Sequence, residues 1–353
     1  MTGFSPRSGL ARIAGSASDG LRMAFERLPP DVRDTVRGKR AALRGLAQLK
    51  RNQGILAQRI ARLELAAATS LADSDSPADD ARVVDPRFPP GIRSRVCTQA
   101  QLQEPWFEAW CTALRERPRA HRKLWEHAYI AQVLDAHGCL GPGRRGLGFG
   151  VGREALTALF AGKGCSIVAT DLAPDSEGAR VWSNTGQHAG GLVGLSRPDI
   201  CDPDAFAELV TWRAVDMRSV PADLTGFDFC WSACSLEHLG TLEAGLEFVE
   251  RSIRTLRPGG VAVHTTEYNL ESNSDTVSAG NTVLYRSADL QALVERLEGQ
   301  GHTVAALDLA PGDGVLDEYV DLPPFVEDPH LRVWFGRYSI TSVALVIRAG
   351  GSA

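Results

Sequence analysis

Short apolar runs alternate with segments of helical spacing from about residue 144 to the end of the chain. RGLGFG, SIVATDLAP, FDFCWSACS and GVAVHTTE predict strands, and REALTALFAGKG, LEAGLEFVERSIRTL and SADLQALVERLEGQG predict the helices among them. The strands are nearly continuous in apolar residues, which is typical of a mostly parallel sheet covered by helices on both faces. The pattern therefore predicts an α/β protein.

The residues before this alternation divide into three parts. Residues 98–138 have helical spacing with large apolar residues, so we expect one folded domain over 98–353. Residues 69–97 are rich in Pro, Asp and Ser, which predicts a linker. Residues 1–68 are expected to form a helical N-terminal region.

Within that region, residues 36–67 carry a heptad pattern. Its positions are spaced alternately by four and three residues: Ala42, Leu46, Leu49, Gln53, Leu56, Ile60, Leu63 and Ala67. Such a seam fits a coiled coil that joins two copies of the chain. It fits equally well a helix that packs on its own catalytic domain.

Charge is distributed unevenly along the chain. Residues 1–66 have a net charge of +8, although the whole chain has a formal net charge of -5. A basic arm can contact an anionic membrane surface or glycan, but it also suits an ordinary solvated helix face. The acidic remainder argues against a nucleic-acid substrate, because phosphate binding needs a basic surface. The seven scattered cysteines form no CxxC pair, and we see no signal peptide or spanning segment, so we expect a cytoplasmic protein.

The stretch GLGFGVGREAL, residues 146–156, marks the expected ligand site. It follows the first predicted strand, and parallel sheets bind ligands at the carboxyl ends of their strands. A dinucleotide fingerprint would need glycine where Arg153 stands, and the Gly-Lys-Ser/Thr of a P-loop is absent. The remaining motif is Gly148-x-Gly150-x-Gly152 followed by a helix.

With this motif the chain resembles the class I S-adenosylmethionine-dependent methyltransferases over residues 144–350. LRPGGVAVHTTE is similar to the turn and fifth strand of that family, and FDFCWSACSLEHLG to its fourth strand and following loop. The resemblance implies a Rossmann-like doubly wound sheet of seven mostly parallel strands. TVAALDLA and TSVALVIRA would supply its antiparallel edge.

The resemblance also implies the cofactor, S-adenosyl-L-methionine, and its contacts. Asp171 ends the second strand, where the family's acidic residue accepts hydrogen bonds from the ribose, and Leu172 follows it. Asp216 and Met217 would read the adenine. The glycines 148, 150 and 152 and Ser232 complete the expected cofactor site. Gly146 stands where many relatives carry an acid, so Glu154, another side chain or water would contact the methionine end.

The segment SLEHLG places two titratable groups after the fourth strand. His238 is the expected general base, because imidazole accepts protons near neutral pH. Glu237 would orient the site or hold substrate, and Glu267 would contact substrate at the end of the fifth strand. His264, inside that strand, is expected in the core. His238, His264 and Glu267 could bind a divalent metal, but their spacing does not demand it, and we predict none.

Two long loops are expected to cover the cleft, residues 175–210 and 311–338. They carry Trp182, His188, His330 and Trp334, which suit an organic substrate or simply pack on each other. We expect O-methylation of a sugar or glycan intermediate, or of a natural product. The alternatives are N- or C-methylation of another small molecule, and a non-catalytic cofactor-binding scaffold acting through its coiled coil.

Overall fold

The computed structural model describes residues 39, 43, 46–56, 87–176 and 190–351. The chain divides into two compact units, Met1–Gly54 and Ile55–Ala353. Near the N-terminal end of the described residues, 46–56 are helical. The heptad residues Leu46 and Leu49 of this helix are 54% and 46% exposed. The remaining positions of the predicted seam lie largely outside the described residues, so the coiled coil stays a prediction.

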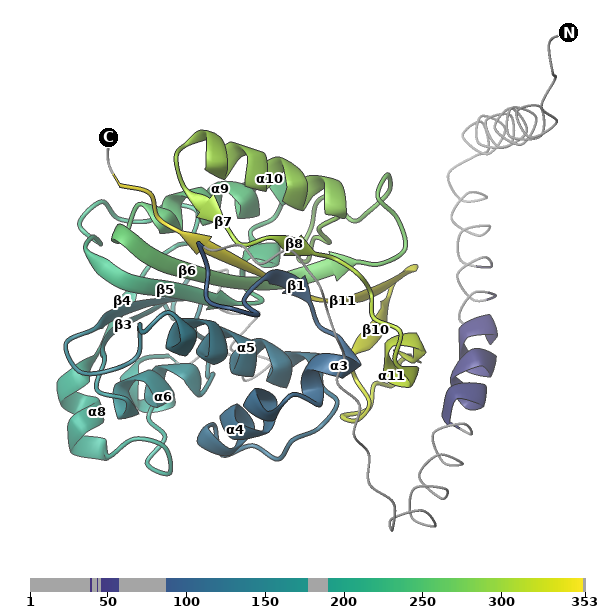
Figure 1. Ribbon diagram of the computed structural model, residues 1–353, viewed down its shortest axis with the longest axis horizontal. Helices are drawn as coiled ribbons and strands as arrows, with labels where there is room; N and C mark the ends of the chain where they lie inside the picture. Colours follow the sequence, from purple (N-terminus) through teal and green to yellow (C-terminus); the bar gives the residue numbers. More distant parts are fainter. Residues whose placement is uncertain (1–38, 40–42, 44–45, 57–86, 177–189, 352–353) are drawn as a thin grey trace, which may run out of the picture. The chain divides into compact units, whose positions relative to one another are not determined.

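The larger unit is built on one twisted sheet, which crosses the middle of Figure 1. Its main path runs in the order β4-β3-β2-β5-β6-β11-β1-β8, with β7, β9 and β10 attached beside this path. The strands are β1 (Ser94–Val96), β2 (Arg145–Phe149), β3 (Ser166–Asp171), β4 (Val210–Ala214), β5 (Phe227–Ala233), β6 (Leu256–Asn269), β7 (Thr303–Val304), β8 (Leu307–Asp308), β9 (Val320–Asp321), β10 (Arg332–Phe335) and β11 (Tyr338–Arg348).

Helices cover both faces of this sheet (Figure 1). They are α3 (Gln99–Leu102), α4 (Pro105–Ala113), α5 (Arg122–Ala136), α6 (Leu156–Gly162), α8 (Pro203–Leu209), α9 (Leu242–Ile253), α10 (Ser287–Gly299) and α11 (Val315–Glu318), with the 3-10 turns η1 (Leu192–Gly194) and η2 (Leu236–His238). The expected helix over LEAGLEFVERSIRTL ends at Ile253, because LRPGG already belongs to β6.

The two largest apolar clusters of the described residues lie one on each side of the sheet. The first joins α4, α5 and α6 to the sheet and includes Trp125 and Phe160. The second joins α9 and α10 to the opposite face and includes Phe248 and Leu290. Successive residues of β6 supply Val263 to the first core and Ala262 to the second, as expected for a strand buried on both faces. The predicted fold class is therefore confirmed.

The sheet differs from the expectation in its size and in the place of its antiparallel strand. It has eleven strands rather than seven, because strands of two to four residues such as β8 and β9 are too short to show a sequence pattern. Every antiparallel strand pairing in the described residues involves β11. This strand is not at an edge, since it lies between β6 and β1. Its eleven residues are buried except for Arg348, which suits an interior position.

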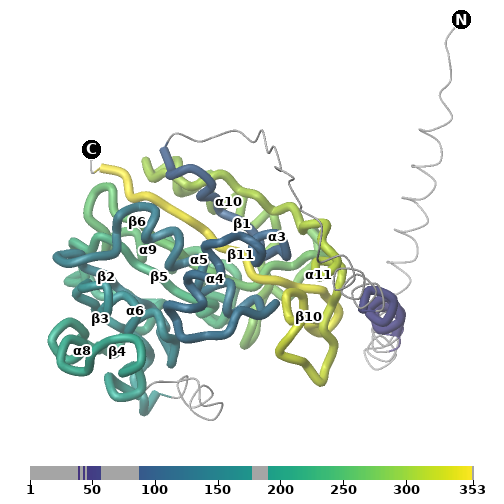
Figure 2. The backbone as a smooth tube through the Cα atoms, turned by 60° about the horizontal axis from the view of Figure 1, so that its bottom comes forward, coloured from purple at the N-terminus to yellow at the C-terminus, as the bar shows by residue number. Residues whose placement is uncertain are grey.

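The predicted linker is also too long at its carboxyl end. Phe88 and Ile92 are buried in the first core, and β1 pairs with β11 through Arg95 and Ala344. Residues 87–97 thus belong to the folded unit. Nearby, α3 and α11 lie side by side in both Figure 1 and Figure 2, and the Gln99 amide donates to Asp317 across 2.8 Å.

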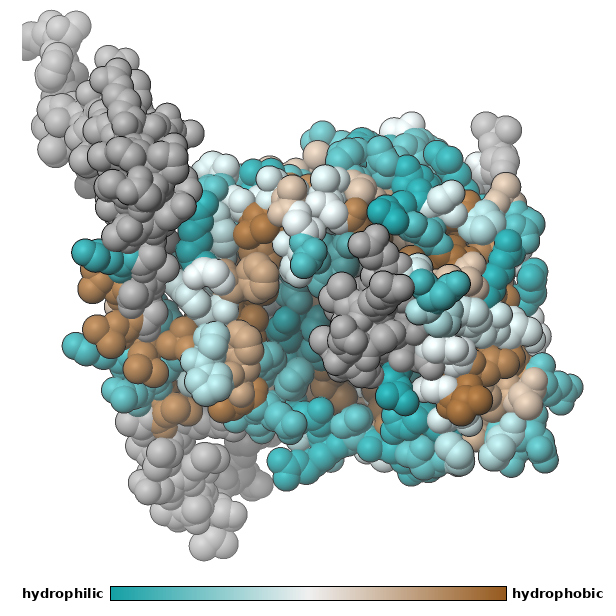
Figure 3. Space-filling model, turned by 180° about the vertical axis from the view of Figure 1, so that it is seen from behind, coloured by the Kyte–Doolittle hydropathy of each residue, from teal (hydrophilic) through white to brown (hydrophobic). Residues whose placement is uncertain are grey.

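The surface seen from behind is mainly hydrophilic, with smaller hydrophobic areas between the polar residues (Figure 3). Among the described residues, no helix is both long and apolar enough to cross a membrane.

Candidate functional site

A cleft of about 900 Å³ opens at the carboxyl ends of the parallel strands. Gly150 follows β2, Asp171 ends β3, Val215 follows β4, and Ala233 ends β5. Glu267 reaches the cleft from β6. Strand ends from distant parts of the chain therefore meet where a ligand of an open parallel sheet is expected.

The glycine loop after β2 leaves room that a side chain would fill. Gly150 and Gly152 have φ values of 57° and 51°, in the left-handed region that favours glycine. A Cβ on Gly150 would lie 2.8 Å from the Ser235 side chain and 3.2 Å from the Met217 sulfur. This bare backbone lines the cleft and can approach a ligand closely, as the predicted cofactor requires.

Two carboxylates line the same half of the cleft. Asp171 is buried, and its side chain accepts from the Gly152 amide at 3.0 Å and the Leu172 amide at 2.8 Å. These contacts hold the carboxylate beside the glycine loop. Asp216 is paired with Arg218 at 2.7 Å, and this hydrogen bond lowers the pKa of Asp216. Met217 and Leu172 also line the cleft, so the four expected cofactor contacts Asp171, Leu172, Asp216 and Met217 all belong to its lining.

Gly148 and Ser232, both expected at the cofactor, do not lie in the cleft lining. A Cβ on Gly148 would meet Trp231 and Val151 at 2.5 Å, so this glycine serves internal packing. Ser232 is fully buried, and its hydroxyl lies 2.8 Å from Nδ1 of His264. Side chains alternate along a strand, and Ser232 points away from the cleft for that reason. These two assignments are corrected.

His264 is a core residue, as predicted. Its Nε2 lies 2.8 Å from the Ser252 hydroxyl, so both ring nitrogens have a serine partner. Burial lowers the pKa of His264 to about 3. Because both nitrogens are engaged inside the protein, His264 cannot join His238 and Glu267 around a metal ion.

Glu154 lies where the methionine end of the cofactor is expected. A Cβ on Gly146 would collide with the Phe229 ring, so an acid cannot stand at that position. Glu154 lines the cleft, accepts from the Trp231 indole at 2.5 Å and lies 3.8 Å from Nε2 of His127. Burial raises the pKa of Glu154 to about 8. A cationic amino group arriving beside it would favour its ionised form.

His238 lines the other half of the cleft with Asn281 and Thr282. Its Nδ1 lies 2.7 Å from the Asn281 carbonyl oxygen, which can only accept a hydrogen bond. In the neutral ring Nδ1 must then carry the proton, and Nε2 carries the basic lone pair. The local fold thus selects one tautomer of the predicted base.

Glu237 lies behind the cleft lining rather than in it. It is fully buried, and its Oε2 accepts from the Thr266 hydroxyl at 3.0 Å. Its Oε1 is 3.8 Å from Nε2 of His238 and has no hydrogen-bond partner among the described residues. Burial raises the pKa of Glu237. Of the two roles expected for Glu237, orienting the site fits this buried place, whereas direct contact with substrate does not.

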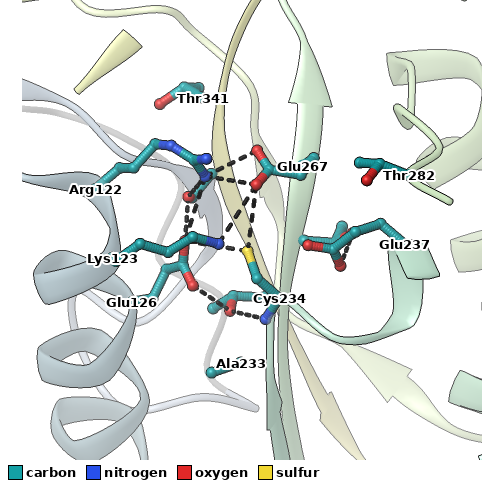
Figure 4. Close-up of polar contacts among 12 residues, drawn as sticks. Arg122, Lys123, Glu126, Ala233, Cys234, Glu237, Glu267, Thr282 and Thr341 are labelled. Atoms are coloured by element: carbon teal, nitrogen blue, oxygen red, sulfur yellow. Dashed lines mark hydrogen bonds and ion pairs between the residues drawn. The ribbon is translucent and has the colours of Figure 1, made fainter. Parts of the chain in front are cut away.

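A charged cluster that sequence reasoning missed lies between α5 and β6 (Figure 4). Arg122 donates to both oxygens of Glu267, at 2.7 and 2.8 Å. The Lys123 ammonium lies 3.4 Å from both Glu126 and Glu267. The Cys234 thiol donates to Glu126 at 3.1 Å. Lys123, Glu126, Cys234 and Glu267 all line the cleft, and we call these residues with Arg122 the α5–β6 cluster.

The cluster is made possible by local features of two elements. His121 precedes α5, and its Nδ1 accepts from the Lys123 amide at 3.1 Å, which fixes the start of the helix. Cys234 has a φ of 44°, unusual for a residue with a side chain, where the chain leaves β5. One signal was available in the sequence: Lys123 is one of only four lysines in a chain rich in arginine.

Cys234, Glu237 and Glu267 also place one ligand atom each within 4.8 Å of one another. Arg122 and Lys123 already neutralise Glu267 beside this group, which works against a divalent ion there. Of the loop residues expected over the cleft, Trp182 and His188 lie outside the described residues. His330 stacks on His121 at 4.6 Å and pairs with Asp321 at 2.6 Å, and Trp334 lies in β10.

Comparison with known proteins identifies the domain that carries this cleft. Residues 147–264, from β2 into β6, match the family model described as a methyltransferase domain. Curated proteins give no match to the chain.

Two solved structures of methyltransferases align with the chain at low identity. An amino pentose methyltransferase from Micromonospora echinaspora is 16% identical, over 70% of this chain and 99% of its own, with a TM-score of 0.39. A magnesium protoporphyrin IX methyltransferase from Synechocystis PCC 6803 is 12% identical, over 71% and 98%, with a TM-score of 0.38. These similarities are too low to transfer an acceptor to this chain.

Residues 147–264 therefore form a methyltransferase domain, and its strands belong to a Rossmann-like, mostly parallel sheet. The protein is an S-adenosylmethionine-dependent methyltransferase, and S-adenosyl-L-methionine is its cofactor. The glycine loop, Asp171, Asp216 and Met217 are the residues of this chain that would hold it.

Proposed function

We propose that the protein methylates a hydroxyl oxygen of a small molecule, a sugar or glycan intermediate or a related natural product, with His238 as the general base. The observation that carries the proposal is the tautomer of His238. Its Nδ1 is committed to the Asn281 carbonyl at 2.7 Å, in a ring that lines the cleft. A base at this place is useful for a hydroxyl, which must lose a proton as it attacks.

The residues around His238 support its role. Nε2 would take the proton of the hydroxyl, and the positive ring would then lie 3.8 Å from Glu237 Oε1. The charged ring favours the ionised form of that carboxyl, so each group makes the other's charge less costly. Glu237 is therefore proposed as a positioning residue for the imidazolium.

When bound, S-adenosylmethionine supplies a methyl group that its sulfonium has already activated. What remains for the protein is to hold the acceptor close and aligned and to receive its proton. The cleft provides a cofactor half around the glycine loop and an acceptor half around His238 and the α5–β6 cluster.

The test is a search for the acceptor with isotope-labelled cofactor in an extract of the source cells, followed by NMR of the labelled product. We expect the methyl carbon on oxygen. A product methylated on nitrogen or carbon would reject O-methylation and favour the alternative small-molecule chemistry.

With that acceptor, His238→Ala should lower turnover about 100-fold or more, because a positioned base acts in the transition state. Cofactor affinity in calorimetry should stay the same. His302→Ala, a histidine outside the cleft lining, is the control and should leave turnover unchanged. Normal turnover of His238→Ala would remove the base assignment.

A further inference from the structure

The acceptor half of the cleft contains a polar arrangement whose ligand is unassigned. Lys123 and Glu126 come from α5, more than a hundred residues before Cys234 and Glu267. None of the four residues belongs to the glycine loop or to the carboxylates expected at the cofactor. They form one wall of the cleft (Figure 4).

The carboxylates of this wall are held in place by contacts with other residues of the protein. Glu267 is clamped by Arg122, and Glu126 is fully buried, where it accepts from Thr265 at 3.2 Å and also contacts Ser342. Holding buried carboxylates in one geometry is costly unless each is paired and hydrogen-bonded. Their positions are therefore set before any ligand arrives.

Lys123 is the part of the wall that reaches the opening. Its side chain is 38% exposed, whereas those of Arg122 and Glu267 are 9% and 7% exposed. An ammonium has three N–H donors, and the contacts within the described part of the chain direct it to two carboxylates at 3.4 Å. Burial opposes the charged form of Lys123, but Cys234, Glu126 and Glu267 outweigh it and raise its pKa. Lys123 is thus a permanent donor rather than a base.

The charges of the wall balance. Arg122 and Lys123 offset Glu126 and Glu267. Beside this neutral set of groups, an anionic acceptor would have an uncompensated negative charge, and a cationic acceptor an uncompensated positive charge. A neutral molecule that can both donate and accept hydrogen bonds fits without a charge penalty. Hydroxyl groups have both abilities.

We propose that Lys123 and Glu267 bind two neighbouring hydroxyl groups of a neutral acceptor, Lys123 donating to one oxygen and Glu267 accepting from the other. This inference rests on the proposed function and narrows its acceptor to a vicinal diol. It makes Lys123 a specificity-determining residue, because an acceptor lacking the second hydroxyl would lose a hydrogen bond to one of these two charged groups.

The experiment compares four six-membered rings that differ only in their polar groups. The probes are cis-1,2-cyclohexanediol, cyclohexanol, cyclohexanecarboxylate and cyclohexylammonium. Their affinities for the full chain, saturated with S-adenosylhomocysteine, are measured by ligand-observed NMR titration. We expect the diol to bind about tenfold more tightly than cyclohexanol, since one added hydrogen bond is made to a charged group. The carboxylate and the ammonium should bind more weakly than the diol.

In Lys123→Met the diol should lose its advantage over cyclohexanol, while the affinity for S-adenosylhomocysteine stays the same. Lys163→Met is the matched control, because that lysine lies over Trp110 at 5.4 Å, outside the cleft lining. If Lys123→Met does not fold by circular dichroism, Lys123→Leu, which also has no hydrogen-bond donor, takes its place with the same expected loss.

Three results would overturn the inference: equal binding of the diol and cyclohexanol, tightest binding of either charged probe, or a diol preference that survives in the Lys123 variants. The measurement involves no methyl transfer. Its failure is therefore distinguishable from a failure of O-methylation, which is judged by the labelled product.

Discussion

Replacing Gly150 by alanine should damage both the stability of the protein and its cofactor site. The residue would have to adopt a φ of 57°, which costs a residue with a side chain about 1–2 kcal/mol. Its Cβ would also lie 2.8 Å from the Ser235 side chain, and overpacking of this kind costs about 1–3 kcal/mol. Together these effects should lower the free energy of unfolding by about 2–5 kcal/mol.

Gly143 is a control position at which only one of these two destabilising effects applies. Its φ is 80°, but a Cβ there would meet nothing within 4 Å. Gly143→Ala should therefore lose only the conformational part, about 1–2 kcal/mol. Urea unfolding of both variants, followed by circular dichroism, measures the difference. Calorimetry with S-adenosylmethionine should show normal affinity for Gly143→Ala and strongly weakened affinity for Gly150→Ala.

A further variant tests the source of the overpacking. Ser235→Gly removes both side-chain atoms that the new Cβ would meet, so the double variant Gly150→Ala, Ser235→Gly should recover part of the stability relative to the two single changes. If Gly150→Ala is no less stable than Gly143→Ala and binds the cofactor normally, the close approach of backbone and ligand at this loop is refuted.

Asp171→Ala should weaken the binding of S-adenosylmethionine by about 1.5 kcal/mol or more in calorimetry, because a charged hydrogen-bond acceptor is lost. Asp175→Ala, at an exposed position, should leave the affinity unchanged. Equal affinities of the two variants would remove the assignment of Asp171 to the ribose. The free energy of unfolding should fall as pH rises from about 4.5 to about 8, because Glu154 keeps its proton over that range in the folded state and loses it in the unfolded state. Glu154→Gln should reduce this pH dependence in urea titrations. An unchanged pH dependence would mean that Glu154 is not the titrating group responsible. Deletion of residues 1–68 should halve the mass measured by light scattering and leave the sheet folded; an unchanged mass would speak against a coiled-coil dimer.

The parts of the site that sequence reasoning located are those tied to strand ends. Met217 could be placed only by the resemblance to the family, whereas Asp171 could be placed because it ends an apolar strand and parallel strands bring their carboxyl ends together. His238 follows from the same rule. The positions of Asp171 and His238 depend only on the order of elements along the chain.

The assignments that failed required the direction of individual side chains. Ser232 and Cys234 are two residues apart, yet Ser232 enters the core and Cys234 the cleft, because the chain leaves β5 in a left-handed turn at Cys234. Glu237 and His238 are adjacent, and a single 3-10 turn separates a buried residue from one in the cleft. The pattern of apolar residues along a sequence does not show where such turns occur.

The α5–β6 cluster could not be seen for a different reason. Arg122, Lys123 and Glu126 have the charge pattern of an exposed helix start, and only the packing of α5 on β6 and β11 buries Arg122 and Glu126 and partly covers Lys123. Contacts such as Arg122 to Glu267 join residues 145 positions apart, which no local pattern reports.

The cleft draws its two halves from different stretches of the chain. The expected cofactor contacts lie within residues 147–264, but Lys123, Glu126, Glu267, Asn281 and Thr282 lie before or after this matched domain. Acceptor choice can thus change by substitution in α5 or in the segment after β6 while the methyl-donor half is left intact. For an engineer, Lys123, His127, Asn281 and Thr282 are positions to randomise when a new acceptor is wanted. Retained binding of S-adenosylhomocysteine would identify the variants whose methyl-donor half is intact.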